Sequence, residues 1–181
     1  MNVFYLDEDP KVCAQMHCDK HVVKMIIEYA QLMSTAHRML DGKEYYGKTK
    51  NGRKIKRWEH PTPSLENILY KASHINHPST IWTRANYKNY HWLYTMWMHL
   101  CNEYTIRYGK VHECDRKLSH ILCMLPQNIP DGEFTQPTQA MPDQYKTKNS
   151  IEAYRKYYIG DKKRFATWKL RDVPEWYGQV S

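Results

Sequence analysis

The feature that most constrains the fold is one long helical pattern in residues 80–108. Apolar and aromatic side chains in this segment cover nearly the whole circumference of a helix. A helix that is apolar on all sides has to be buried by other elements. The pattern therefore predicts a long central helix around which the rest of the chain packs.

The remaining chain is predicted to form shorter helices, one hairpin and one long loop. Helical periodicity covers residues 10–40 and stops at an Asp-Gly pair, and an Asn-Gly turn between basic, aromatic runs predicts a hairpin at residues 43–60. Further helices are expected at residues 63–74, capped by Ser64, at 113–125 and at 150–168. Four prolines between Pro126 and Pro142 predict a loop over residues 126–149. We expect one domain over residues 1–181: a mainly α, compact helical fold around a long central helix, with a small basic hairpin.

Charge indicates the kind of partner. The chain has 27 Lys and Arg against 19 Asp and Glu, a net charge of +8, and the basic residues lie among aromatic ones. Cations that neutralise phosphates release condensed counterions, so nucleic acid is the expected partner, with duplex DNA first. Five irregularly spaced cysteines, no long apolar run and no signal-type segment predict a soluble cytoplasmic protein, in a bacterial or phage-infected cell. Nothing in the sequence indicates a cofactor, a membrane or an obligate protein partner.

The helix expected at residues 10–40 concentrates reactive side chains. In projection one side carries an apolar row that faces the core, and the opposite side carries a polar stripe. The stripe consists of His17, Lys20, His21, Lys24, Glu28, Gln31, Thr35 and Arg38.

Three interpretations of this stripe stay open. It can be a solvated face with ion pairs four residues apart, such as Lys24 with Glu28. It can hold a metal through His17 and His21 and belong to a metal-dependent hydrolase, although a zinc site needs at least three ligands and His37 points elsewhere. It can be a catalytic face, where cations hold a polyanion and Glu28 moves a proton or stabilises positive charge on a sugar.

The same segment resembles a known family. Asp19, His21, the two valines after it and Glu28 are similar to the first-helix motif of the pyrimidine-dimer DNA glycosylases of phage and bacteria. That motif has an acid, any residue, a histidine, two aliphatic residues and a glutamate seven residues after the histidine. "AYRKYYIGDKK" near the C-terminus is similar to the aromatic, basic motif of that family, and "NHPST" to its histidine-containing turn.

The resemblance implies a helical DNA glycosylase, with or without abasic-site lyase activity, in DNA repair or base modification. Glu28 would be catalytic, with His21, Lys20 and Lys24 beside it. An aromatic platform would hold the exposed nucleotide, and the candidates for it are Trp58, Tyr157, Tyr158 and Trp168. Nucleic acid would be bound by His17, Arg38, Lys54, Lys56, Arg57, His77, Arg84, Arg155, Lys156, Tyr157 and Tyr158.

One departure concerns the nucleophile. The lyases of this family use the α-amine of a threonine that is exposed when the initiator methionine is removed. This chain has Asn2, which is too large for ordinary methionine removal, so the amine would be that of Met1, with Lys20 or Lys24 as alternatives. A glycosylase that uses water fits equally well. So does a protein that keeps the fold and only binds nucleic acid or a nucleotide.

Overall fold

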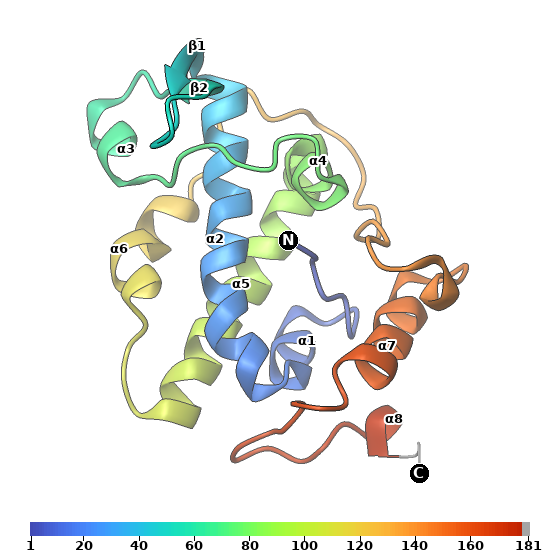
Figure 1. The fold of residues 1–181 in the computed structure, drawn as a ribbon. Coiled ribbons are helices and arrows are strands. Elements are labelled where there is room, and N and C mark those ends of the chain that lie inside the picture. The colour runs from blue at the N-terminus through green and yellow to red at the C-terminus, as the bar shows by residue number, and fades with distance from the viewer. Residues whose placement is uncertain (179–181) are drawn as a thin grey trace.

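The computed structural model describes residues 1–178, and two long helices run side by side through its centre (Figure 1). They are α2 (Asp19–Asp41) and α5 (Tyr87–Tyr108). The buried indole of Trp97 joins them, because its N–H donates to the carbonyl of Ile26 at 2.9 Å. Shorter helices surround this pair: α1 (Pro10–Met16), α3 (Pro63–Ile68), α4 (Pro78–Ala85), α6 (Glu113–Leu122), the 3-10 turn η1 (Asp143–Tyr145), α7 (Ser150–Asp161) and α8 (Glu175–Gly178).

This architecture confirms the expected fold class, a mainly helical single domain around a long central helix. The hairpin is confirmed as well. Strands β1 (Lys43–Lys48) and β2 (Lys54–Glu59) pair antiparallel, with Gly52 in a left-handed turn conformation. The hairpin stands at the carboxyl end of α2 (Figure 1). Within residues 1–178, no helix has both the length and the apolar character that crossing a bilayer requires.

Two predicted helices are each interrupted. Residues 10–40 form α1 and α2, with a break where Cys18 is extended (ψ 160°) and caps α2. Residues 80–108 form α4 and α5, with a break at the extended Asn86 (φ −160°, ψ 166°). The Asn86 side chain accepts the N–H of Asn89 at 2.9 Å, which is the bond of a helix N-cap. The apolar periodicity continues across each break because the helices on both sides bury an apolar face. The pattern alone therefore does not reveal the break.

Several predicted ends are also wrong. α3 stops at Ile68, and its N-cap position is Thr62, so Ser64 lies inside the first turn. α6 ends at Leu122, and α7 ends at Asp161, well before residue 168. The chain then runs back toward α2, where the N–H of Lys169 donates to Asp19 at 2.9 Å. The predicted loop over residues 126–149 is confirmed apart from η1.

The first six residues are an extended, buried segment. Val3, Phe4, Tyr5 and Leu6 are all in the core. The N–H of Phe4 donates to the Tyr29 hydroxyl at 3.2 Å, and its ring lies 4.4 Å from the ring of His21 on α2 and 5.4 Å from that of Tyr158 on α7. The segment therefore lies between α2 and α7, and this position brings Met1 against α2.

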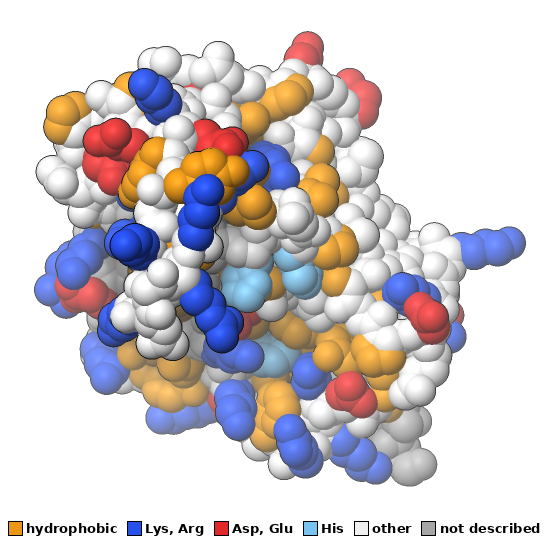
Figure 2. Space-filling view, turned by 45° about the horizontal axis from the view of Figure 1, so that its top comes forward, with side chains coloured by type: hydrophobic (Ala, Val, Ile, Leu, Met, Phe, Trp, Pro, Cys, Tyr) orange, Lys and Arg blue, Asp and Glu red, His pale blue; other side chains and the backbone are white. Residues whose placement is uncertain are grey.

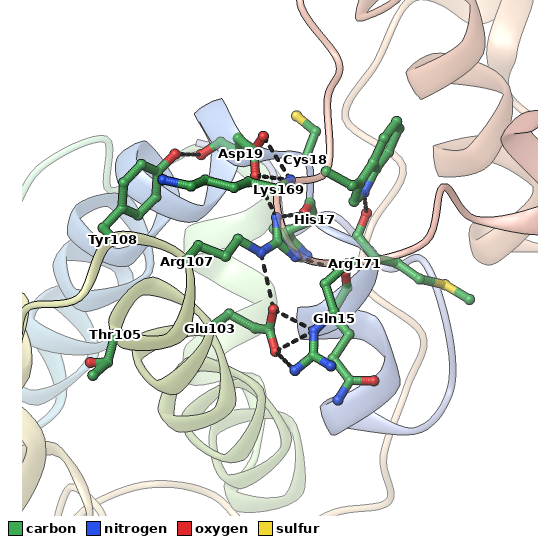
Figure 3. A network of polar contacts seen from close by, with 12 residues as sticks. Gln15, His17, Cys18, Asp19, Glu103, Thr105, Arg107, Tyr108, Lys169 and Arg171 are labelled. Atoms are coloured by element: carbon green, nitrogen blue, oxygen red, sulfur yellow. Dashed lines mark hydrogen bonds and ion pairs between the residues drawn. The ribbon is translucent and has the colours of Figure 1, made fainter.

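A buried ionic network lies where the start of α2 meets the end of α5 (Figure 3). Arg107 of α5 donates to Glu103 at 3.0 Å, to Asp19 at 3.0 Å and to the carbonyl of His17 at 2.8 Å. Arg171 donates to the opposite side of the Glu103 carboxylate at 2.6 Å. The network ties α5 to the α1–α2 junction and to the C-terminal segment.

Candidate functional site

The α-amine of Met1 and the Glu28 carboxylate form the centre of the candidate site. The amine nitrogen lies 3.1 Å from Glu28 Oε2, and Lys24 Nζ lies 3.4 Å from Glu28 Oε1. The side chain of Met1 is 8% exposed, that of Glu28 18% and that of Lys24 64%. The site therefore extends from the edge of the core to the solvent. It combines a carboxylate and a primary amine within hydrogen-bond distance, which is the pair that imine chemistry needs.

His77, at the end of the 70–77 loop, borders this centre, and His74 of the same loop lies near His77. His77 is the N-cap of α4, and its Nδ1 accepts the N–H of Ser79 at 3.1 Å. Burial lowers the pKa of His77, and the Met1 amine and His74 lower it further, while Glu28 opposes them. His77 is therefore a neutral neighbour of the amine, with its proton on Nε2. His74 is exposed and has φ 48°, a left-handed conformation that is uncommon for a residue with a side chain.

His21 and His17 lie below the surface, which corrects their place on a polar stripe. His21 is buried, and its Nδ1 is 2.6 Å from the Tyr158 hydroxyl. His17 is not part of α2, and both its ring nitrogens are bonded, one to the carbonyl of Cys13 at 2.8 Å and one to the Tyr29 hydroxyl at 2.7 Å. Burial lowers the pKa of His21 to about 2 and that of His17 to about 4. Both are neutral packing residues that position Tyr29 and Tyr158.

Arg38 is the clearest correction to the predicted nucleic-acid-binding set. It is buried, and each of its five N–H groups has an acceptor. Nε donates to the carbonyl of Tyr70, Nη1 to the carbonyl of Trp58 and to the Glu66 carboxylate, and Nη2 to the carbonyls of Glu66 and Leu69. No donor is left for a phosphate. Arg38 instead fastens the hairpin and α3 to α2, and Thr35 of the stripe is buried beside it.

Further cations lie near His21, two helical turns before Glu28 on α2. Lys20 Nζ lies 4.7 Å from the centre of the Phe165 ring, and Lys162 Nζ lies 4.4 Å from that of Tyr157. Lys20, Lys24 and Lys162 all lower the pKa of His21, although burial lowers it most. Figure 2 shows histidine side chains gathered near the middle of one face, with lysine and arginine side chains on several sides of them.

The hairpin also presents charge to solvent. Lys54 Nζ lies 4.1 Å from the centre of the Tyr46 ring, and Lys56 pairs with Glu44 at 3.2 Å, both on the exposed strands. Arg57 is half-buried and donates to the carbonyl of Ala72 at 2.9 Å. Lys54 and Lys56 are thus exposed to solvent, and their contact with phosphates stays a prediction, whereas Arg57 mainly anchors the hairpin.

The remaining predicted residues divide between surface and core. Lys156 is exposed and Tyr157 is half-buried, whereas Tyr158 is in the core. Arg155 donates to the carbonyl of Leu6 at 2.9 Å, and Arg84 to that of Ile75 at 3.0 Å, so both have structural bonds. The structure therefore brings Met1, Lys24, Glu28 and His77 together and leaves Lys156 apart from them on α7.

The structure also assembles a group that the sequence did not indicate. In residues 1–178, one set of at least three His, Cys, Asp or Glu side chains converges closely enough to hold a metal, and it is His37, Asp41 and His60. His17 and His21 are not part of it, so the metal alternative built on them lacks its ligand set. His37 and Asp41 are one helical turn apart, a spacing that signals a possible pair of ligands, but His60 directly follows β2 and no local pattern connects it to them.

Comparison with known proteins finds no family model, no curated protein and no solved structure that matches the chain. Function has to be argued from the geometry of the sites themselves.

Proposed function

We propose that the protein is a DNA glycosylase that acts on a damaged or modified base through the α-amine of Met1 and the carboxylate of Glu28. One observation carries the proposal, the 3.1 Å contact between the amine and Glu28 Oε2 at a half-buried position. Lys24 at Glu28, with Lys20 and Lys162 near His21 two turns away, would supply the charge that holds phosphates. The resemblance of the Asp19–Glu28 segment to pyrimidine-dimer glycosylases agrees with the same assignment of Glu28.

The chemistry follows from the pair. The ammonium gives a proton to Glu28 Oε2, and the free amine attacks C1′ of the nucleotide. The C1′–N bond to the base breaks as the N–C1′ bond forms, and the amine nitrogen then loses its second proton to the departing base. Glu28 gives the proton that it accepted to O4′, so that the C1′–O4′ bond breaks and an imine forms between the amine and C1′, from which the 3′ phosphate can leave by β-elimination. Glu28 would thus accept and return one proton, and its ionised carboxylate would then stabilise the cationic imine.

The nucleotide has to leave the base stack to reach this amine, at a cost of a few kcal/mol. Trp58 and Trp168, expected as platforms, are buried, with indole or backbone groups bonded inside the fold. Phe165 and Tyr157 are half-buried and lie under the ammonium groups of Lys20 and Lys162. These two rings are the better candidates for contact with an extruded base.

Borohydride trapping tests the proposal. Wild-type protein and a duplex with one abasic site should give a covalent complex on reduction, and peptide mapping should locate the adduct on the Met1 amine. A variant with one glycine added before Met1 displaces the amine from Glu28 and should trap at least roughly a hundredfold more slowly. Lys20→Gln and Lys24→Gln should still trap. An adduct on Lys20 or Lys24 would contradict the assignment of the nucleophile.

One observation favours a second function. Both oxygens of Glu28 already carry a cation, Met1 on one and Lys24 on the other, as in an ordinary structural ion pair. A protein that binds nucleic acid without cutting it would show this arrangement too. Tight, salt-dependent duplex binding with no adduct and no base release would identify that function.

A further inference from the structure

His37, Asp41 and His60 form a buried group of potential ligands at the carboxyl end of α2, well away from Glu28 along the helix. His37 and Asp41 lie one turn apart on α2, and His60 directly follows β2. One ligating atom from each residue lies within 4.8 Å of the other two, and His60 Nε2 lies 3.9 Å from Asp41 Oδ2. A tetrahedral site with bonds of about 2.0 Å needs ligand atoms roughly 3.3 Å apart, so only small side-chain shifts separate the group from that geometry.

His60 has a buried nitrogen without a partner. Its side chain is 4% exposed, and Nε2 has no hydrogen bond. Nδ1 accepts the N–H of Thr62 at 3.1 Å, so the proton of the neutral ring is on Nε2 and points toward Asp41 without reaching it. A metal on Nε2 moves that proton to Nδ1. Thr62 is exposed, so water can take over its N–H.

His37 already has the tautomer of a metal ligand. The Tyr90 hydroxyl donates to the carbonyl of Leu122 at 2.8 Å, so at its 2.9 Å contact with His37 Nε2 it has to be the acceptor. Nε2 therefore carries the proton, which makes Nδ1 the nitrogen that can bind a metal, and the backbone of Met124 also lies close to the ring. Metal-bound histidines usually donate their other N–H in this way, which fixes the ring. Burial lowers the pKa of both His37 and His60, so both rings are neutral at pH 7.

Asp41 is held in place by a different part of the chain. Its side chain is 6% exposed, and it accepts the N–H of Gln127 at 2.8 Å and that of Asn128 at 2.9 Å. Asp41 Oδ1 also accepts the side-chain N–H of Asn128 at 3.0 Å. These bonds orient the carboxylate, and Oδ2, the oxygen that faces His60, keeps a lone pair. The charge of Arg38 nearby is balanced by Glu66, so it does not cancel that of Asp41.

We propose that His37, Asp41 and His60 bind a divalent transition metal ion of the zinc class. Two imidazole nitrogens and one carboxylate oxygen suit such an ion, and three protein ligands leave a fourth position open. Asp41 and His60 also line a cavity of about 470 Å³, bounded by Gly42, Lys43, Pro63 and Glu66, from which water can fill that position.

The ion would connect both ends of the hairpin to α2. Asp41 lies two residues before β1, and His60 follows the last residue of β2. Metal binding therefore fixes the base of the hairpin, and its loss leaves the strands more open to local unfolding. The proposal does not depend on the glycosylase reaction, because none of the three ligands belongs to the Glu28 site.

Cobalt titration of the chelator-treated protein is the direct test. We expect one equivalent of Co²⁺ to bind with the visible absorption of a tetrahedral ion and to be displaced by Zn²⁺. His60→Gln should weaken binding by roughly a hundredfold or more. Loss of a residue that only hydrogen-bonds to a ligand costs about 10- to 100-fold, and loss of a ligand itself should cost at least as much. His91→Gln, on the exposed face of α5, should bind as the wild type does.

His60→Cys separates loss of a ligand from loss of the fold. It should keep the ion and add cobalt–thiolate absorption, whatever the stability of His60→Gln. Trypsin, which cuts at the lysines and arginines of residues 43–59, should act more slowly on the zinc-loaded protein, and this protection should disappear in His60→Gln. The proposal is overturned if wild type binds no stoichiometric Co²⁺, or if His60→Gln is folded and binds it equally well.

Discussion

Each carboxylate oxygen of Glu28 contacts one cation, and the two contacts differ in how much they contribute to stability. The exposed pair with Lys24 contributes about 0–1 kcal/mol to stability, because water and salt screen it. The contact with the Met1 amine is far less exposed, and it holds the end of the buried first segment. Glu28 therefore has a modest structural role whether or not it is catalytic.

Glu28→Gln tests which role dominates. The amide has nearly the same size and can still accept a hydrogen bond from the Met1 amine, so the fold should hold. The variant cannot take a proton, so base release or strand cleavage should fall by about 10²–10⁴, while duplex binding should be equal or tighter. Single-turnover rates and titrations measure both. Glu152→Gln, an exposed glutamate of α7, is the control. Full activity in a folded Glu28→Gln protein would refute a catalytic Glu28.

The buried histidines predict how stability depends on pH. Burial lowers the pKa of His17 to about 4 and that of His21 to about 2, against about 6.5 in an unfolded chain. As pH falls below about 6.5, these histidines bind protons in the unfolded state but not in the folded state, so the free energy of unfolding decreases. At pH 5 each histidine accounts for a loss of roughly 2 kcal/mol. Urea denaturation at pH 7 and pH 5 measures this change.

His21→Gln should reduce that loss by about 2 kcal/mol, because the unfolded chain then has one proton fewer to gain. His120→Gln, which removes an exposed histidine, is the control. Equal pH dependence in wild type and His21→Gln would show that His21 titrates in the folded protein.

At the scale of elements, α5 is held to the α1–α2 junction by the network around Glu103. This carboxylate is buried and shared by two guanidinium groups, Arg107 and Arg171. Removing one member of a buried ionic network leaves the others unpaired, which costs about 3–5 kcal/mol. Such a loss is a large part of the stability of a domain of this length.

Glu103→Gln should therefore lower the free energy of unfolding by about 3–5 kcal/mol. Glu113→Gln is a matched control, since Glu113 also contacts two cations, Arg116 and Lys117, but in solvent on α6, and it should cost about 1 kcal/mol or less. Chemical denaturation gives both values. Similar losses in the two variants would mean that burial of the Glu103 network adds nothing.

Sequence patterns identified most elements but not where they break or which polar residues are buried. The hairpin was predictable because its turn is local. Asn86 is a strong capping residue, yet the apolar pattern on both sides hid its break. Arg38 looked solvent-facing because projection shows one helix at a time, and its five acceptors come from residues 58–70. The Glu28 side chain is 18% exposed, and its contact with the Met1 amine could not be predicted because it depends on how the first segment packs.

At the scale of the whole molecule, α2 works as a spacer between the Glu28 site and the hairpin. Thirteen residues separate Glu28 from Asp41, which is about 20 Å along a helix, or roughly six base pairs of duplex. On the hairpin, Tyr46, Lys48, Lys54 and Lys56 share one face by their register, and Tyr46 is 59% exposed. A duplex that lies along α2 would meet this face about six base pairs from the nucleotide at Glu28.

Duplex length should reveal this spacing. With an uncleavable abasic analogue, Lys54→Gln combined with Lys56→Gln should weaken binding to a duplex that has ten base pairs on each side, and should lower the slope of log affinity against log salt by about 2. Shortening the duplex to three base pairs should matter on one side of the analogue only. On that side, the shortening should weaken binding of wild type by as much as the double substitution does, and it should not weaken binding of the double variant further.

Arg116→Gln combined with Lys117→Gln removes the same charge from α6 and should respond to length as wild type does. This comparison separates a contact made by the hairpin from a general effect of net charge. If shortening either side weakens wild type and the hairpin variant by the same factor, the hairpin does not touch the duplex, and cations elsewhere, such as the lysines near His21, hold it.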